Sequence, residues 1–499
     1  MLIAYDLGTT GNKASLHHDD GRLVSAVTVG YGVNFADGGV AEQDPEDWWN
    51  AVVQATRTLM ARSGADPADV IGLTVSGQMM GAVLLDANYR PVRPAIIWAD
   101  TRSTKQTAAL EQRIGIEPAY ALLGHRLNPT YSLEKVMWVR DEEPDVFARV
   151  RHFCVAKDYV VSRLTGRLAT DRSDASATNA YDQGRGTWSS EMIAAAELDA
   201  SIFPGVLEST TVVGTLTAEA ASATGLGRET RVVMGGGDGP IAAVGAGVVA
   251  PQDGAYACLG TSSWISFCSE APVADPLMRT MTFDHVVPGS YVPTATMQAG
   301  GAAMQWVSEL LTPEPSSTRL SALVAEASTA EASTGGLYFL PYLLGERSPY
   351  WNPDASGAFL GIRRHHGRAE MARAVLEGVA FNLLTCIQAF RESGSTVDRV
   401  DAIGGGAVSD VWLQIMADVW GLPVRRRTIV EEGNSLGAAV TAAVGLELVE
   451  DFGAARGLSE ITAEFHPDEV RHRDYLTRHT TFVDGYASLE PWFSRRRGR

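Results

Sequence analysis

A single carboxylate stands between a glycine run and a small-residue run near the middle of the chain. Residues 231–250 read RVVMGGGDGPIAAVGAGVVA, so a short apolar strand ends in three glycines, Asp238 follows, and a segment suited to a helix comes next. Glycines at a strand end let the backbone turn sharply and let a ligand approach it. The helix start favours an anion, and a lone acid there can accept a hydroxyl proton or hold a metal ion. The alternative is a plain turn in which Asp238 only caps the helix.

A second acid precedes a glycine and threonine turn at the start of the chain. A short apolar strand runs into DLGTTGNK, residues 6–13. The turn offers backbone N–H groups, the hydroxyls of Thr9 and Thr10 and the ammonium group of Lys13, a set that suits a phosphate. The pattern LGTT of residues 7–10 returns as LGTS at residues 259–262, with Cys258 in the place of Asp6. Recurrence near mid-chain predicts a duplicated domain.

Four strand-to-turn sites stand out in this way, at residues 6–13, 235–238, 260–262 and 404–409. None of them is a P-loop, because the pattern GxxxxGK[ST] is absent. Two Gly/Thr hairpin turns and two glycine-rich strand–helix turns, divided between two halves of the chain, indicate a nucleotide held in a cleft. Asp6 and Asp238 would then face its phosphates.

The elements that must position these residues are strands that end in polar turns, with helices between them. Strands are predicted at 2–5, 70–75, 82–85, 95–98, 231–234 and 400–403, and helices at 45–60, 370–392, 410–420 and 436–444. Residues 137–167 are predicted to be mostly helical and residues 167–182 to form an ordered polar loop. This alternation predicts an α/β fold with ligand sites at the strand ends.

Length and composition limit the classes of protein that fit. A chain of 499 residues is too long for one core, so at least two domains are expected. The formal net charge of −18 argues against a nucleic-acid partner. Four cysteines with no CxxC pair fit a reducing, cytoplasmic compartment. We find no signal peptide and expect no apolar stretch long enough to span a bilayer, hence no membrane partner.

Nine motifs in a fixed order carry a resemblance to a known family. They are DLGTT at 6–10, SGQM at 76–79, WADTR at 98–102, KDYVVSRLTG at 157–166, TDRSDAS at 170–176, GGGD at 235–238, LGTSS at 259–263, FLPYLLGERSP at 339–349 and GGGAVSDVWLQIMAD at 404–418. Together they resemble the FGGY carbohydrate kinases, and within that family the xylulokinase branch. The resemblance extends to about residue 445.

The resemblance implies two actin-like (ribonuclease H-like) domains with a cleft between them. Residues 1–245 would form the N-terminal FGGY domain, sugar-binding and catalytic, and residues 246–499 the C-terminal, nucleotide-binding domain. The implied reaction transfers the γ-phosphate of ATP to a primary hydroxyl of a ketopentose, with D-xylulose as the expected substrate. The alternatives are a family kinase for another ketose or polyol (ribulose, a pentitol, a tetritol or glycerol) and a non-catalytic actin-like ATP-binding sensor.

The resemblance also assigns roles to residues. Asp238 would be the general base, and Asp6 would position Mg²⁺, with Asp238 as a second metal ligand. The implied sugar-binding residues are Gln78, Met79, Met80, Trp98, Asp100 and Asp238. The implied ATP-binding residues are Thr9, Thr10, Lys13, Gly260, Thr261, Gly301, Gln305, Gly405, Gly406 and Ser409. The expected partners are a small sugar and ATP, and a homodimer is left open.

Two residues depart from the family pattern. Met80 stands where xylulokinases typically have His, and Thr130 stands where the family usually has Gly, Ser, Met or an aromatic residue. By resemblance both would lie beside the sugar and alter its selection. Glycerol kinases have Arg-Glu after the residue that matches Gln78, so glycerol is disfavoured as the main substrate.

Overall fold

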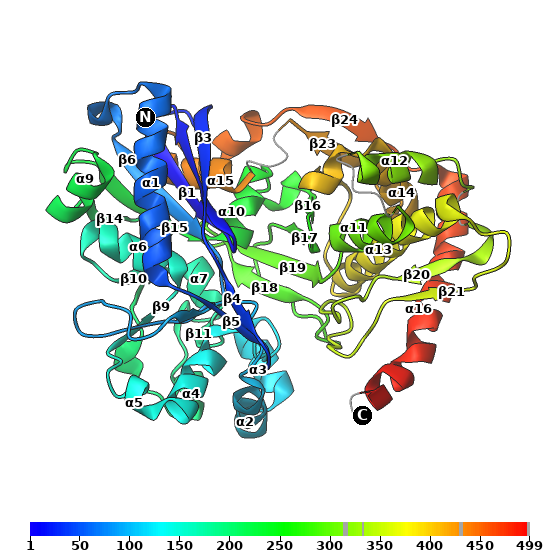
Figure 1. Ribbon diagram of the computed structural model, residues 1–499, viewed down its shortest axis with the longest axis horizontal. Helices are drawn as coiled ribbons and strands as arrows, with labels where there is room; N and C mark the ends of the chain where they lie inside the picture. The colour runs from blue at the N-terminus through cyan, green and yellow to red at the C-terminus, as the bar shows by residue number, and fades with distance from the viewer. Residues whose placement is uncertain (313–317, 332–333, 429–432, 497–499) are drawn as a thin grey trace.

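Two lobes, each built on one large sheet, make up the molecule (Figure 1). The computed structural model describes residues 1–312, 318–331, 334–428 and 433–496. The first sheet has the strand order β14-β15-β6-β1-β2-β3. Its strands are β1 (Leu2–Leu7), β2 (Gly11–His17), β3 (Leu23–Gly30), β6 (Gly72–Gly77), β14 (Val212–Thr215) and β15 (Arg231–Gly237).

The second sheet has the order β18-β19-β17-β16-β22-β23-β24. Its strands are β16 (Ala255–Leu259), β17 (Ser263–Phe267), β18 (Met281–Asp284), β19 (Tyr291–Met297), β22 (Val400–Ile403), β23 (Val424–Arg427) and β24 (Ile461–Phe465). In both sheets an antiparallel three-strand unit pairs through its first strand with two parallel strands. This shared topology confirms the predicted duplication and the α/β class with two actin-like domains.

Alternation along β1 explains how helices cover both faces of the first sheet. Ile3, Tyr5 and Leu7 pack with helices α1 (Pro45–Ser63) and α6 (Ala156–Thr165). Leu2 and Ala4 point to the other face and pack with α15 (Gly433–Gly445). Successive strand residues face opposite sides, so one short apolar strand serves two helix layers.

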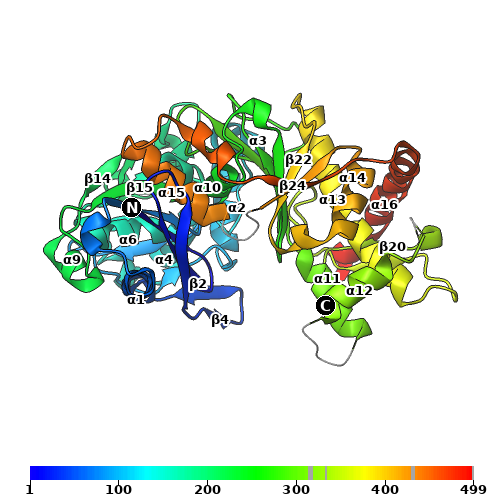
Figure 2. The same cartoon turned by 90° about the horizontal axis from the view of Figure 1, so that it is seen from above.

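Two helices, one from each half of the chain, cross closely where the lobes join (Figure 2). They are α15 and α10 (Asp238–Gly245). A Cβ at Gly245 would lie 1.9 Å from the carbonyl oxygen of Gly433, and a Cβ at Gly437 would lie 2.1 Å from that of Ile241. Only glycine permits this approach, so backbone packs against backbone next to Asp238. A helix from the second half of the sequence thus completes the first lobe.

The core of the second lobe surrounds α13 (Arg368–Glu392), with α14 (Asp410–Trp420) beside it. By length and composition α13 is apolar enough to cross a membrane, contrary to the expectation that no stretch is. Its most apolar window is 83% buried inside the lobe. Burial on all sides explains the apolar composition, because a core helix needs no polar face.

The remaining elements are shorter or lie at the edges of the lobes. The helices are α2 (Thr104–Ile114), α3 (Ile116–Leu123), α4 (Ser132–Glu142), α5 (Pro144–Phe147), α7 (Arg172–Ser176), α8 (Ser190–Ala195), α9 (Ala218–Thr224), α11 (Gly301–Leu311), α12 (Arg319–Ala327) and α16 (Glu469–Arg496). The strands are β4 (Asn34–Ala36), β5 (Val40–Gln43), β7 (Val83–Leu85), β8 (Ala95–Ile96), β9 (His152–Cys154), β10 (Ala169–Asp171), β11 (Tyr181–Asp182), β12 (Thr187–Trp188), β13 (Gly205–Leu207), β20 (Tyr338–Leu340) and β21 (Ala358–Leu360).

One local prediction is confirmed with a detail added, and one is corrected. Residues 137–167 are mostly helical, as predicted, but the short strand β9 interrupts them and pairs antiparallel with β7. The loop predicted over 167–182 contains β10 and α7. The polar residues there cap a helix: the Asp171 side chain accepts the N–H groups of Ser173 and Asp174. The remaining strand and helix predictions above are confirmed to within a few residues.

Candidate active site

Asp238 is the first residue of α10 and directly follows β15. β15 pairs in parallel with β6, and β6 with β1, so the carboxyl ends of the three strands meet at one edge of the first sheet. Asp6, next to the last residue of β1, lies at the same edge. Gly235 permits this packing, because it has φ +72° and a Cβ there would lie 2.0 Å from the carbonyl oxygen of Val75. Parallel pairing and glycine therefore bring the two predicted acids together.

Burial perturbs both carboxylates, and the charge of Asp6 also acts on Asp238. Burial, followed by the negative charge of Asp6, raises the pKa of Asp238 to about 7. Burial also raises the pKa of Asp6, although a hydrogen bond from Asn434 and the charge of Lys13 oppose the shift. Asn434 Nδ2 donates to Asp6 Oδ1 at 3.4 Å, and Gly239 N donates to Asp238 Oδ1 at 2.8 Å. A half-buried carboxyl with its pKa near neutrality suits a general base, and two such acids favour a cation beside them.

A pocket of about 160 Å³ opens beside Asp238, and both lobes line it. We call it the cleft pocket. Four predicted sugar-binding residues line it, namely Met79, Met80, Trp98 and Asp238. Sequence reasoning missed the other lining residues, which are Gly239, Pro240, Tyr256, Ser262, Trp264, Ser266, Met281, Phe283, Thr294, Thr296, Arg347 and Asn434.

Trp98 connects the cleft pocket to the hairpin that carries Asp6. Its Nε1 donates to Thr9 Oγ1 at 2.9 Å, and the guanidinium group of Arg347 lies 5.6 Å from the centre of its ring. Thr10 and Lys13 belong to the same β1–β2 hairpin, with Lys13 directly opposite Asp6 in the strand register. The predicted phosphate contacts of these three hairpin residues remain a prediction, since the hairpin residues line neither pocket described here.

Gln78 and Asp100 do not line the cleft pocket, and their sugar-binding role remains a prediction. The buried Gln78 Nε2 donates to Gln43 Oε1 at 2.8 Å, and Gln43 Nε2 in turn donates to the carbonyl oxygen of Thr9 at 2.8 Å. Asp100 is buried and accepts hydrogen bonds from Ala41 N at 2.7 Å and from the Arg102 side chain at 2.6 Å. Asp100 and the amide nitrogen of Gln78 are thus bonded to protein groups, whereas the buried Oε1 of Gln78 has no hydrogen-bond partner among the described residues.

The two departures from the family pattern differ in position. Met80 lines the cleft pocket with φ +65°, an uncommon conformation for a residue with a side chain. The buried Lys135 holds it there, donating at 3.0 Å to the Met80 carbonyl oxygen and also to the Thr130 carbonyl oxygen. Thr130 lines a neighbouring pocket of about 610 Å³, and its hydroxyl donates to Asn128 Oδ1 at 2.8 Å. Only Met80 is therefore placed to contact a sugar in the cleft pocket.

A second pocket, of about 650 Å³, lies in the second lobe. We call it the glycine pocket. All seven ATP-binding residues predicted in the second half line it, namely Gly260, Thr261, Gly301, Gln305, Gly405, Gly406 and Ser409. They meet because β16 and β22 are parallel neighbours, so the turns after them share one edge of the second sheet. Gly301 N donates to the carbonyl oxygen of Gly260 at 2.8 Å and fixes the start of α11 against the hairpin turn.

One turn joins the two pockets. Thr261 lines the glycine pocket, and the next residue, Ser262, lines the cleft pocket. Ligands in the two pockets would therefore meet at this turn, with Asp238 on the cleft side.

Tyr256 strengthens the junction between the lobes, since its hydroxyl donates at 3.1 Å to the carbonyl oxygen of Gly239, next to Asp238.

A buried charge cluster supports the strand end that carries Asp238. It consists of Lys157, Asp158, Asp171 and Asp174, each at most 1% exposed. Lys157 Nζ lies 2.8 Å from Asp158, 3.2 Å from Asp171 and 3.4 Å from Asp174. Asp171 Oδ2 accepts the Ser173 hydroxyl at 2.5 Å, and that hydroxyl accepts Gly237 N at 2.9 Å. The motifs at 157–166 and 170–176 thus place the residue before Asp238.

The fold and the site define a class of protein. Two duplicated lobes, a small pocket with an acid of raised pKa between them and an adjoining pocket rich in glycine fit a two-domain phosphotransferase. Models of the "FGGY family of carbohydrate kinases" match this chain, the N-terminal domain over residues 1–245 and the C-terminal domain over residues 255–446. The chain belongs to the FGGY family of carbohydrate kinases, and ATP is its phosphoryl donor.

Relatives support this membership over the whole length. The chain is 35% identical to the xylulose kinase of Escherichia coli (strain K12), covering 98% of this chain and 99% of that protein. A crystal structure of xylulose kinase from Rhodospirillum rubrum matches with a TM-score of 0.92 at 31% identity, covering 99% of both chains. A ligand-bound xylulose kinase from Lactobacillus acidophilus matches with a TM-score of 0.93 at 25% identity, again over 99% of both chains.

Proposed function

We propose that this carbohydrate kinase phosphorylates a primary hydroxyl of the ketopentose D-xylulose. The observation that carries the proposal is the turn at Thr261 and Ser262, which places the glycine pocket next to the cleft pocket and its acid. The volume of about 160 Å³ lies below the roughly 300–1,000 Å³ typical of pockets for drug-sized ligands, which favours a small acceptor. The xylulose kinases that resemble this chain from end to end support the choice of sugar.

In the proposed mechanism Asp238 accepts a hydrogen bond from the primary hydroxyl and takes its proton. The hydroxyl oxygen forms a bond to the γ-phosphorus, and the bond from that phosphorus to the bridging oxygen breaks, so that ADP leaves. The hairpin of Thr9, Thr10 and Lys13 would hold the transferring phosphoryl group. Gly260, Thr261 and the glycines at 405–406 would hold the nucleotide in the glycine pocket.

The acids at the strand edge fit Mg²⁺. Within the described part of the chain no group of three or more His, Cys, Asp and Glu forms a metal cage. Mg²⁺ does not need such a cage in a nucleotide site, because one or two carboxylates bind it together with phosphate oxygens and water. Asp6 and Asp238 would hold it, and its charge would offset the repulsion that raises the pKa of Asp238. When bound, Mg²⁺ neutralises charge on the phosphate oxygens.

The direct test is ADP release by the purified protein over a panel of acceptors. The panel contains D-xylulose, ribulose, pentitols, tetritols, ketohexoses, gluconate and glycerol, each with ATP and Mg²⁺. We expect the highest kcat/KM with D-xylulose or another ketopentose. A protein that phosphorylates only glycerol or only hexoses would overturn the ketopentose assignment, and ADP release independent of any acceptor would favour an ATP-binding switch.

The compartment proposed is the cytoplasm. All four cysteines, Cys154, Cys258, Cys268 and Cys386, are free thiols, and three of them are buried. Free thiols in a chain of this size fit a reducing compartment.

Substitution of Gly405 tests the nucleotide role of the glycine pocket. A Cβ at Gly405 meets no protein atom within 4 Å, so a valine side chain fits the fold and projects into the pocket. We expect Gly405→Val to raise KM for ATP about 5- to 150-fold, since overpacking a binding surface costs roughly 1–3 kcal/mol. The melting temperature should stay unchanged.

The matched control is Gly205→Val on β13 in the first lobe, where an added Cβ also meets no atom within 4 Å. Steady-state kinetics with ATP as the varied substrate should show no change for this variant. Equal values of KM for ATP in both variants would contradict nucleotide binding in the glycine pocket.

Met80→His tests the sugar side of the cleft pocket. A His can donate or accept one hydrogen bond, whereas a thioether is a weak acceptor. One neutral hydrogen bond contributes about 0.5–1.5 kcal/mol, so we expect the ratio of kcat/KM between two related sugars to change roughly 2- to 12-fold. Thr130→Gly is the control, because Thr130 lies outside the cleft pocket and should leave the order of sugars unchanged. An unchanged order for Met80→His would show that this position does not select the sugar.

A further inference from the structure

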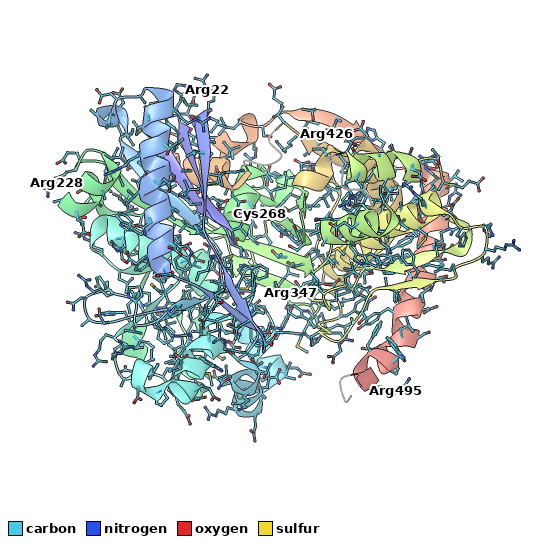
Figure 3. The ribbon with its side chains drawn as sticks, in the orientation of Figure 1. Arg22, Arg228, Cys268, Arg347, Arg426 and Arg495 are labelled. Atoms are coloured by element: carbon cyan, nitrogen blue, oxygen red, sulfur yellow. The ribbon has the colours of Figure 1, made fainter. Side chains whose placement is uncertain are left out.

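Arg347 is a cation in the cleft pocket whose side chain forms no direct contact with a carboxylate among the described residues, although the charge of the neighbouring Glu346 acts on it at longer range. Its side chain forms no hydrogen bond or ion pair with any residue in the described ranges of the chain. Of the described residues that line the pocket, it alone carries a positive charge. Figure 3 shows Arg347 between the two lobes. A charge in a largely desolvated site is costly unless something pairs with it, so an unpaired guanidinium group here points to a ligand oxygen.

Neighbouring groups hold Arg347 in place without using its N–H donors. Its backbone N–H donates at 2.8 Å to Oε1 of the buried Glu346, which anchors the main chain. The central carbon of the guanidinium group lies over the ring of Trp98 from the other lobe, 5.6 Å from the ring centre. A contact with an aromatic face leaves the in-plane N–H groups free. Those groups therefore remain available to a ligand held between the lobes.

The chemistry of the donor selects among the groups of a small sugar. A guanidinium group has five donors and no acceptor, and a ketone oxygen only accepts. The donors of the guanidinium group therefore match the acceptor of the ketone, and a hydrogen bond from a charged donor is stronger than one from a neutral donor. A hydroxyl, by contrast, both donates and accepts, so it can turn to the hydroxyls of Ser266, Thr294 or Thr296 in the same pocket.

We propose that Arg347 recognises the ketone group of the acceptor sugar, by donating hydrogen bonds to the carbonyl oxygen, and thereby favours a ketose over the corresponding pentitol. This inference rests on the proposed function and adds the residue that sets the substrate class. Asp238 would serve the hydroxyl that is phosphorylated, and Arg347 a group that does not react. Because the two residues come from different lobes, a ketose would also bridge the lobes.

The test compares one ketose with one polyol in the same assay. KM for D-xylulose and the inhibition constant of xylitol against it are measured for the wild type, Arg347→Met and Arg347→Lys. We expect Arg347→Met to raise KM for D-xylulose about 10- to 150-fold, the range of a hydrogen bond to a charged group, and the inhibition constant of xylitol less than about 3-fold. Arg347→Lys should recover part of the loss, because the charge remains but the planar fork is gone.

Arg228→Met is the matched control. Arg228 is exposed and follows α9, on the outer side of the first lobe in Figure 3. It should change neither constant. Equal increases for D-xylulose and xylitol in Arg347→Met, or no increase in either, would overturn the inference, as would a wild type that binds gluconate more tightly than D-xylulose. Failure of the wild type to phosphorylate D-xylulose would instead overturn the proposed function.

A second measurement covers the case in which Arg347→Met does not fold. Carbon NMR of D-xylulose labelled at its carbonyl carbon, bound to the wild type without ATP, reports the hydrogen bonding of that carbonyl. A downfield shift of the signal on binding supports donation from a cation. A carbonyl signal that stays at its position in water, while the sugar is bound, would overturn the inference without any variant.

Discussion

Asp238→Asn lowers kcat by about 10²–10⁴-fold while ATP still binds, because the amide cannot take the proton of the attacking hydroxyl. The substitution keeps the shape of the side chain, and its oxygen can still accept the hydrogen bond from Gly239 that Asp238 Oδ1 accepts at 2.8 Å. Steady-state kinetics together with nucleotide binding separate the two effects. A purified variant that retains more than about a tenth of the wild-type kcat would exclude a base role of ordinary size.

The same variant has a predicted effect on stability with the opposite sign. Burial and Asp6 raise the pKa of Asp238 to about 7, against about 4 in an unfolded chain. The folded state therefore binds the proton more tightly, and the free energy of unfolding falls as the pH rises from about 4 to 7. An Asn side chain does not ionise, so the free energy of unfolding of Asp238→Asn does not fall in this pH range for that reason. The variant should therefore be more stable than the wild type at neutral pH, by at most about 4 kcal/mol. At pH 4 or below the two should melt at the same temperature.

Lys157→Met should cost about 3–5 kcal/mol of stability, because it leaves buried carboxylates without their cation. Burial alone would lower the pKa of Lys157, but Asp158, Asp171 and Asp174 outweigh it and raise that pKa. Neither carboxylate oxygen of Asp174 has a hydrogen-bond partner within the described residues, so that residue depends on the ammonium group. Urea unfolding monitored by circular dichroism measures the loss.

Lys105→Met is the control for this change. Lys105 is exposed and lies 3.6 Å from Glu142, and such surface pairs contribute about 0–1 kcal/mol. In any Lys157→Met protein that folds, kcat should also fall, since the cluster reaches Gly237 through Asp171 and Ser173. Equal unfolding midpoints for the two variants would show that the cluster does not hold the strand end.

Local sequence patterns were enough to predict the α/β fold class and the turns that line the glycine pocket. Glycines placed after apolar strands predicted the turns at 260–262 and 404–409, and parallel pairing of β16 with β22 then brings them together. Predicting these turns required no information about the residues of the other lobe. The same reasoning located Asp6, near the end of β1, and Asp238, directly after β15, and both strands are neighbours of β6.

Sequence reasoning failed where distant segments meet. Tyr256 and Arg347 enter the cleft pocket from the second lobe, and Asn434 enters it from α15, the helix of the second half of the chain that completes the first lobe. Their contribution depends on how these distant segments are joined. The motif at 339–349 contains Arg347 but gives no sign of which pocket it enters. The resemblance to the family implied a sugar-binding role for Gln78 and Asp100, which remains a prediction, but it did not show which protein groups these side chains contact. Their partners, Gln43 and the Ala41 amide, lie on another segment, which a local pattern cannot reveal.

Phosphorus NMR of the products from ATP, Mg²⁺ and D-xylulose tests the central claim most directly, because it identifies the acceptor atom as well as the reaction. The account predicts ADP and one new phosphomonoester whose phosphorus couples to two protons of a primary carbon, formed by the wild type and not detectably by Asp238→Asn over the same time. Inorganic phosphate as the only new phosphorus product besides ADP, or a phosphomonoester on a secondary carbon, would contradict transfer from the glycine pocket to a primary hydroxyl in the cleft pocket.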